Sequence, residues 1–173
     1  YRDRRQRQMC IRDRLYIAQK QNNNWIPLAA MKYIAKFLDM PYIKVYEVAT
    51  FYSMYNLSPV GKYFVQVCTT TPCMIRGANK LVEACKEKIS ENESELSENK
   101  NCSWMEVECL GACVNAPMMQ INDDYYEDLD KEKTLKILDK VLNGERPIPG
   151  SYRGRVNNEP ESNRKTLMDL KNA

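Results

Sequence analysis

Histidine is absent from the 173 residues of this chain. The chain therefore has no imidazole for general acid–base catalysis or a catalytic triad, and a Rieske centre is excluded because it needs two histidines. Neither a G-x-G-x-x-G motif nor a P-loop is present, so the sequence carries no signal for nucleotide or flavin binding. A membrane-spanning helix needs about 18 or more consecutive apolar residues. No such run occurs, and we expect no direct membrane insertion.

Cysteine, by contrast, occurs seven times, and four of these residues form two short pairs. Cys68 and Cys73 have four residues between them, whereas Cys109 and Cys113 have three. A short β-like run precedes each pair. Because two loops that leave neighbouring strands meet at one end of a sheet, we expect the four sulfur atoms to converge there.

Four convergent thiolates suit zinc or an iron–sulfur cluster. Structural zinc sites commonly use C-x2-C knuckles and redox dithiols use C-x-x-C, and neither spacing is present. The C-x4-C spacing is shared with plant-type [2Fe–2S] proteins, although their third cysteine follows sooner. The spacing thus favours an iron–sulfur cluster, and a zinc site or a disulfide stays open as an alternative. Seven cysteines without an even pattern argue against a secreted disulfide scaffold.

Residues 1–14 differ in composition from the rest of the chain. Six of the 26 basic residues lie there, and without this stretch the formal net charge changes from +3 to −1. An arginine run is compatible with nucleic-acid binding, but the stretch looks like translated adapter sequence. We expect it to be a non-native artefact in which Cys10 has no role, and we expect no nucleic-acid partner. Because the chain opens on Tyr1, we also expect the natural N-terminus to be missing.

Residues 15–56 are predicted to form a small helical bundle. A first helix over 15–21 ends at a run of three asparagines, Pro27 begins a second helix, and Pro41 ends that helix and begins a third. The third helix has apolar residues on most of its faces, as expected of a bundle core or of a surface covered by a partner. The turn-rich residues 56–61 are the candidate domain boundary.

Residues 62–144 are predicted to form an α/β domain. Strands are expected over 62–67 and 102–108, each leading into one cysteine pair, and the polar residues 90–101 are predicted to form a solvated loop. Three prolines and scattered basic residues predict an extended tail over 145–173.

The helices of this domain are predicted from their apolar spacing. One helix opens at Pro72 and is followed by a three-four apolar stripe. This stripe consists of Ile75, Ala78, Val82, Cys85 and Ile89. Cys85 is therefore expected in the core as a small buried hydrophobe. A hairpin is expected around Asp123, and a last helix over 131–143 has Asp130 as its predicted N-cap.

Three segments resemble a known family. Val-Cys-Thr-Thr-Thr-Pro-Cys-Met-Ile-Arg-Gly (67–77), residues 107–129 and residues 40–54 are similar to the 24-kDa subunits of respiratory NADH:quinone oxidoreductase, complex I, whose bacterial members are called the E subunit. The resemblance covers about 15–149. Cys102 stands where the family usually has an aromatic residue, which affects local packing only.

The resemblance implies a fold, a cofactor and a partner. It implies a thioredoxin-like [2Fe–2S] domain preceded by a small N-terminal helical bundle, with one cluster bound by Cys68, Cys73, Cys109 and Cys113. It also implies that NADH and FMN bind an adjacent flavoprotein subunit, which exchanges single electrons with this cluster. Such a chain is a peripheral subunit on the cytoplasmic face of the bacterial inner membrane or on the mitochondrial matrix side. No complete active site is expected on this chain alone.

Smaller features of the site carry their own expectations. Gly111 is expected to permit the tight loop between the second pair of cysteines. The hydroxyl groups of residues 69–71 are expected either to donate hydrogen bonds to sulfur or only to shape their turn. Pro117 precedes a strand, a position where thioredoxin-like folds often use a cis-proline, and one sequence leaves its isomer open.

The sequence leaves three alternative functions open. One is the equivalent diaphorase subunit of an NAD-linked hydrogenase or formate dehydrogenase. The second is a zinc-stabilised binding module, and the third is a thioredoxin-like thiol oxidoreductase that uses one cysteine pair as an exchanging disulfide.

Overall fold

The computed structural model describes residues 2–157 and 159. By its contacts the chain divides into two compact units after Lys62. Within the described residues, no helix combines the length and the apolar character needed to cross a membrane. The remainder of the predicted tail, residues 158 and 160–173, lies outside the described residues.

The first unit contains three helices, α1 (Arg2–Gln21), α2 (Leu28–Phe37) and α3 (Tyr42–Phe51). Its core is built from Ile11, Leu15, Ile26, Met31, Ile34, Ala35, Val45, Ala49 and Tyr55. The side chain of Gln19 ties the end of α1 to the segment after α3, because it donates to the Met54 carbonyl and accepts from the Asn56 N–H.

Helix α1 is longer than the sequence indicates. It begins at Arg2 rather than at residue 15, and Ile11 is 1% exposed within the bundle core. The Tyr55 hydroxyl also donates a hydrogen bond of 2.9 Å to the Arg12 carbonyl. Residues 11 and 12 therefore take part in the bundle, and the non-native origin of 1–14 stays a prediction.

Helix α3 is only partly covered by the bundle. Val45 and Ala49, four residues apart on one face, are buried, whereas Ile43 and Phe51 on the other faces are exposed. An apolar helix face that its own unit leaves open is typical of an interaction surface.

The second unit is built on a five-stranded sheet with the order β2-β1-β3-β4-β5. Its strands are β1 (Tyr63–Cys68), β2 (Cys102–Val107), β3 (Met119–Ile121), β4 (Asp124–Glu127) and β5 (Gly150–Ser151). Strands β1 and β2 are parallel and in register, so Cys68 lies opposite Val107. The hairpin of β3 and β4 joins β1 in antiparallel pairing, and β5 pairs with β4 in parallel.

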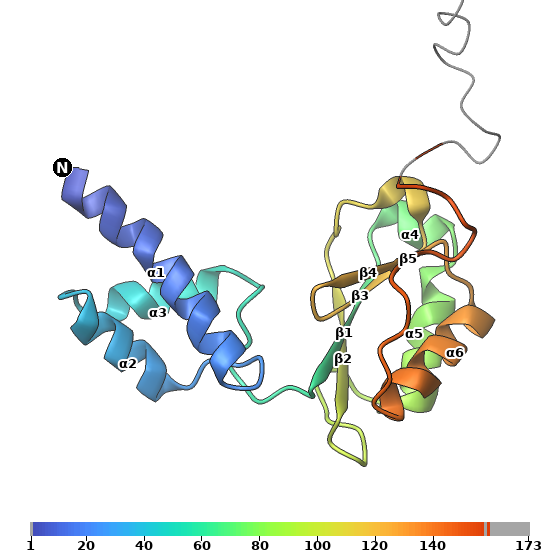
Figure 1. Cartoon of the computed structure of the whole chain (residues 1–173), viewed down its shortest axis with the longest axis horizontal. Coiled ribbons are helices and arrows are strands. Elements are labelled where there is room, and N and C mark those ends of the chain that lie inside the picture. The colour runs from blue at the N-terminus through green and yellow to red at the C-terminus, as the bar shows by residue number, and fades with distance from the viewer. Residues whose placement is uncertain (1, 158, 160–173) are drawn as a thin grey trace, which may run out of the picture. The chain divides into compact units, whose positions relative to one another are not determined.

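Within its described residues this unit has three α-helices, α4 (Thr71–Ile75), α5 (Ala78–Lys88) and α6 (Lys131–Leu142). Helices α5 and α6 lie side by side along one side of the sheet (Figure 1). The core between them includes Trp104 and both Cys85 and Cys102, each 0% exposed. The burial predicted for Cys85 is confirmed.

The helix predicted to open at Pro72 is in fact two helices. Gly77, between α4 and α5, has a φ of +100°, a left-handed conformation that glycine adopts without steric penalty. Because the chain turns there, Ile75 leaves the expected apolar stripe and is 78% exposed. The prediction that Ile75 lines the core is therefore wrong, and the rest of the stripe, from Ala78 onward, is buried.

The elements after the second cysteine pair largely follow the sequence signals. A short 3-10 helix, η1 (Cys113–Asn115), precedes the cis peptide bond between Ala116 and Pro117. The Asp130 carboxylate caps α6 by accepting from the Lys133 N–H at 2.8 Å, which confirms the predicted N-cap.

The described part of the predicted tail packs on the second unit. Strand β5 extends the sheet, and the Tyr126 hydroxyl donates to the Pro147 carbonyl at 3.2 Å. The Arg146 guanidinium forms two hydrogen bonds with the Asp124 carboxylate, at 2.9 and 3.0 Å. This segment is therefore part of the folded unit, because it supplies both a strand and side-chain anchors.

Candidate metal centre

Two loops at one end of the sheet carry the four cysteines that the sequence singles out. Cys68 is the last residue of β1, and Cys73 lies within the short helix α4 that follows it. Cys109 follows β2, and Cys113 begins η1. Because β1 and β2 are parallel, both loops leave the same edge of the sheet, as the sequence predicted.

The four thiols converge as two pairs. The sulfur atoms of Cys109 and Cys113 are 3.4 Å apart, and the thiols of Cys68 and Cys73 are within hydrogen-bonding reach of each other. The backbone of Leu110, between Cys109 and Cys113, is within hydrogen-bonding reach of the Cys68 sulfur. Cys68 and Cys73 are buried, whereas Cys109 and Cys113 are exposed.

The pKa values of the buried inner pair, Cys68 and Cys73, shift in opposite directions. Burial raises the pKa of the Cys73 thiol to about 12, with a further contribution from its hydrogen bond to Cys68. Burial also raises the pKa of Cys68, but hydrogen bonds from Thr70 and from the Leu110 backbone outweigh this effect and leave it below the usual value. In the outer pair, the hydrogen bond to Cys109 raises the pKa of Cys113.

Hydrogen-bond donors already point at the sulfur atoms. The Thr70 hydroxyl lies 3.5 Å from the Cys68 sulfur, and the Gly111 N–H donates to the Cys109 sulfur at 3.4 Å. Gly111 has a φ of +83°, so the tight turn between the outer cysteines uses a conformation that favours glycine. Donors of this kind stabilise thiolate charge and tune a bound iron–sulfur centre.

The paired arrangement fits two metal atoms better than one. A single tetrahedral zinc ion needs four ligand atoms about 2.3 Å from one point when all are thiolates. Among the described residues, no group of three or more cysteine, aspartate or glutamate side chains gathers closely enough to hold one ion. Two pairs, by contrast, match a dinuclear cluster in which each iron takes two thiolates.

Two further contacts fix the outer loop, which carries the exposed Cys109 and Cys113. The sequence did not indicate either contact. The Tyr125 hydroxyl, on β4, donates a hydrogen bond of 2.7 Å to the Leu110 carbonyl inside the loop. At the other end of the loop, the Arg155 guanidinium binds the Val114 carbonyl at 2.9 Å. Both contacts link residues far apart in the sequence, so only the folded unit brings them together.

Comparison with known proteins gives a family for the whole arrangement. The family model described as thioredoxin-like [2Fe-2S] ferredoxin matches residues 1–142. The chain is 55% identical over 129 residues to the E subunit of NADH-quinone oxidoreductase from Rickettsia bellii, an alignment that covers 75% of this chain and 77% of that protein. It is 53% identical over 129 residues to the protein of the same name from Rickettsia typhi, covering 75% of this chain and 76% of that protein.

A solved structure shares the fold at much lower sequence identity. The crystal structure of an NAD+-reducing [NiFe]-hydrogenase in the air-oxidized state contains a chain that superposes with a TM-score of 0.63 at 16% identity. The match covers 75% of this chain and 23% of that chain. Because the identity is only 16%, this likeness shows the fold alone.

Proposed function

Because the chain belongs to the thioredoxin-like [2Fe-2S] ferredoxin family and to the family of NADH-quinone oxidoreductase E subunits, we propose that it carries single electrons. One [2Fe–2S] cluster is held by Cys68, Cys73, Cys109 and Cys113, and electrons are exchanged with FMN on an adjacent flavoprotein subunit. The observation that carries this proposal is the position of the two thiol pairs, on loops that leave the same edge of the sheet.

The buried and the exposed cysteines of the site have different roles. Cys68 and Cys73 lie in an apolar cluster with Ala78, Ala116 and Met118, which keeps water from the inner side. Cys109 and Cys113 are exposed, so the outer side is open to a partner. When bound, the cluster supplies one-electron redox chemistry, and the N–H and hydroxyl donors around the sulfur atoms stabilise its negative charge.

Apolar side chains beside the cysteines mark the surface where the flavoprotein subunit would approach. Met74 and Ile75 follow Cys73 and are 47% and 78% exposed, and Val114 follows Cys113 and is 62% exposed. Exposed apolar residues around a site of this kind are typical of a protein–protein interface. The chain acts as a peripheral subunit, on the cytoplasmic face of the bacterial inner membrane or on the mitochondrial matrix side.

The alternatives differ in what supports them. The fold shared with an NAD+-reducing hydrogenase chain fits the equivalent diaphorase subunit, but the identity of 55% to the E subunit of a bacterial relative favours the NADH-quinone oxidoreductase. A zinc-stabilised module fits less well because the thiols form two pairs rather than one tetrahedral set.

The proposal is tested by reduction of the cluster through the partner. The full chain is reconstituted with iron and sulfide, and we expect dithionite to give the electron paramagnetic resonance signal of a reduced [2Fe–2S] centre. NADH should bleach the visible absorbance of the oxidised protein only when an FMN-loaded flavoprotein subunit of NADH-quinone oxidoreductase is added. A colourless zinc protein, or no bleaching with the flavoprotein present, would contradict the proposal.

Tyr125→Phe provides a test of how the outer loop is held. Removing the hydroxyl leaves the Leu110 carbonyl without its partner, and we expect the free energy of unfolding to fall by about 1 kcal/mol, the usual net value of such a hydrogen bond. Release of iron to a chelator should become faster in the same variant. Tyr152→Phe is the control, because its hydroxyl binds the Ile148 carbonyl instead. Equal iron release in both variants would show that the Tyr125 contact does not hold the site.

A further inference from the structure

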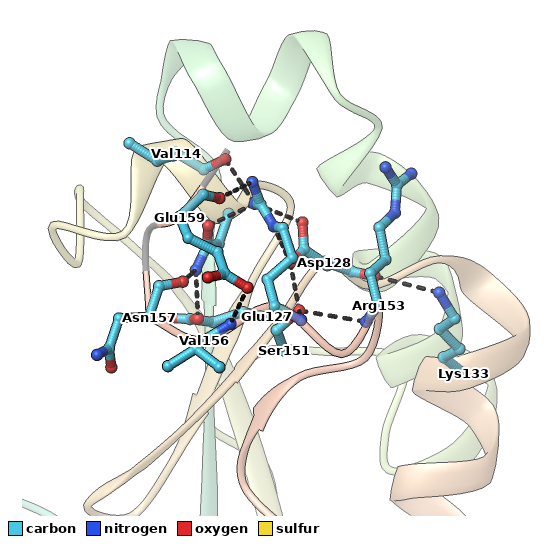
Figure 2. A network of polar contacts seen from close by, with 11 residues as sticks. Val114, Glu127, Asp128, Lys133, Ser151, Arg153, Val156, Asn157 and Glu159 are labelled. Carbon is cyan, nitrogen blue, oxygen red and sulfur yellow. Dashed lines mark hydrogen bonds and ion pairs between the residues drawn. The ribbon is translucent and has the colours of Figure 1, made fainter. Parts of the chain in front are cut away.

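Arg155 lies after β5, and its side chain links the C-terminal segment to the outer cysteine loop. Its guanidinium donates to the Val114 carbonyl at 2.9 Å and to the side-chain oxygen of Asn115. These two residues directly follow Cys113 within η1. Figure 2 shows Val114, Asp128 and Ser151 gathered in this network of polar contacts.

The guanidinium is itself held by a buried carboxylate. Arg155 forms two hydrogen bonds with Asp128, at 3.0 and 2.9 Å, in a fork-to-fork geometry. The side chains of the pair are 12% and 1% exposed. The Ser151 hydroxyl donates a third hydrogen bond to the same carboxylate, at 2.6 Å. Burial raises the pKa of Asp128, but the hydrogen bonds from Arg155 and Ser151 outweigh this effect and hold it below its usual value.

The backbone of Asp128 reaches the same loop. Its N–H donates to the Asn115 carbonyl at 2.8 Å, and the Asn115 amide donates to Glu127 and to the Asn157 carbonyl, each at 2.7 Å. The loop residue after Val114 is thus fixed from β4 and from the C-terminal segment at once. The Nε–H of Arg155 binds Asp128, and the two hydrogens of Nη2 are shared among Asp128, the Val114 carbonyl and the Asn115 side-chain oxygen. An ammonium group cannot match this planar geometry.

We propose that Arg155 is a positioning residue for the cluster: it fixes the backbone that carries Cys113. This inference rests on the proposed function and extends the site to a segment that follows residue 142, where the family match ends. Supports behind a metal ligand orient it and commonly change metal affinity by about 10- to 100-fold when they are removed.

The test compares two arginines that each form two hydrogen bonds with an aspartate, one in a buried pair and one in an exposed pair. Arg155→Gln removes the fork that reaches the Cys113 loop. Arg146→Gln removes a two-bonded pair with Asp124 that also ties the C-terminal segment to β4 but has no hydrogen bond to the loop. Both full-length variants are reconstituted with iron and sulfide without oxygen, then challenged with EDTA while the visible absorbance is followed.

We expect Arg155→Gln to release its cluster about 10-fold faster or more, while Arg146→Gln stays within about twofold of the parent. The g-values or line widths of the reduced cluster should change in Arg155→Gln and not in Arg146→Gln. Arg155→Lys keeps a charge for Asp128 but loses the fork, so it should recover part of the thermal midpoint lost in Arg155→Gln without recovering the release rate of the parent. Recovery of both by lysine would overturn the positioning role.

The outcomes separate this inference from the function on which it rests. If the parent chain forms no [2Fe–2S] centre, the proposed function fails. If the parent forms one and Arg155→Gln releases it at the parent rate, only the role of Arg155 fails. Should Arg155→Gln not fold by circular dichroism, Arg155→Lys decides the matter, since it keeps a charge for Asp128 and loses the fork that reaches Val114 and Asn115. Release at the parent rate in that variant would overturn the inference.

Discussion

Replacing Cys73 with serine is expected to lower the iron content of the protein about 10-fold or more. Removing a residue that only orients a metal ligand commonly lowers metal affinity about 10- to 100-fold, and removing the ligand itself should lower it further. Cys73 is 1% exposed in an apolar cluster. A serine there offers a hydroxyl that is a poor ligand for iron, and burial keeps water from taking the place of the thiolate. The iron and sulfide bound per chain after desalting are the measurement.

The exposure of each cysteine predicts how much iron its serine variant loses. Cys113 is exposed, so water or the introduced hydroxyl can complete the coordination, and Cys113→Ser should retain more iron than Cys73→Ser. Cys85→Ala is the matched control. Cys85 is equally buried but lies in the core between the sheet and the helices, so it should keep the full cluster and lose about 1 kcal/mol of stability. Equal iron loss in all three variants would contradict the assignment of the ligands.

The features that the sequence predicted are those set by neighbouring residues. Each cysteine pair follows a β-rich run, and the pairing of those two strands in parallel brings the loops together. The Asp130 cap and the burial of Cys85 follow in the same way from local spacing. Such signals are carried within a few turns of chain, so they are readable without the fold.

The features that the sequence missed depend on distant partners or on one backbone angle. The turn at Gly77 divides a helix whose apolar spacing is otherwise continuous. Strand β5 has two residues, too short for any alternation, and it exists because β4 offers an open edge. Arg155 and Asp128 are 27 residues apart. A lone arginine in a proline-containing tail carries no signal that it binds a buried carboxylate, and the tail was therefore predicted to be extended.

Leu138→Ala is expected to destabilise the second unit strongly while leaving the cysteines untouched. Leu138, on α6, is 0% exposed in the core that α5 and α6 share with the sheet. Truncating a buried leucine to alanine removes about 2–5 kcal/mol, made up of lost transfer free energy and the cavity left behind. With a urea m-value of about 1–3 kcal/mol/M for a domain of this size, the midpoint should fall by about 1–2 M.

The two tryptophans of the chain allow this effect to be assigned to one unit. Trp104 is buried in the second unit, and Trp25 belongs to the first, so Trp25→Phe leaves a single fluorescent probe in the sheet. Leu135→Ala is the control, because Leu135 lies on the same helix and is only partly buried against the core. It should lower the midpoint by less than half as much. If the urea midpoints of Leu138→Ala and Leu135→Ala were equal, the prediction that Leu138 is a main packing contact between α6 and the sheet would be wrong.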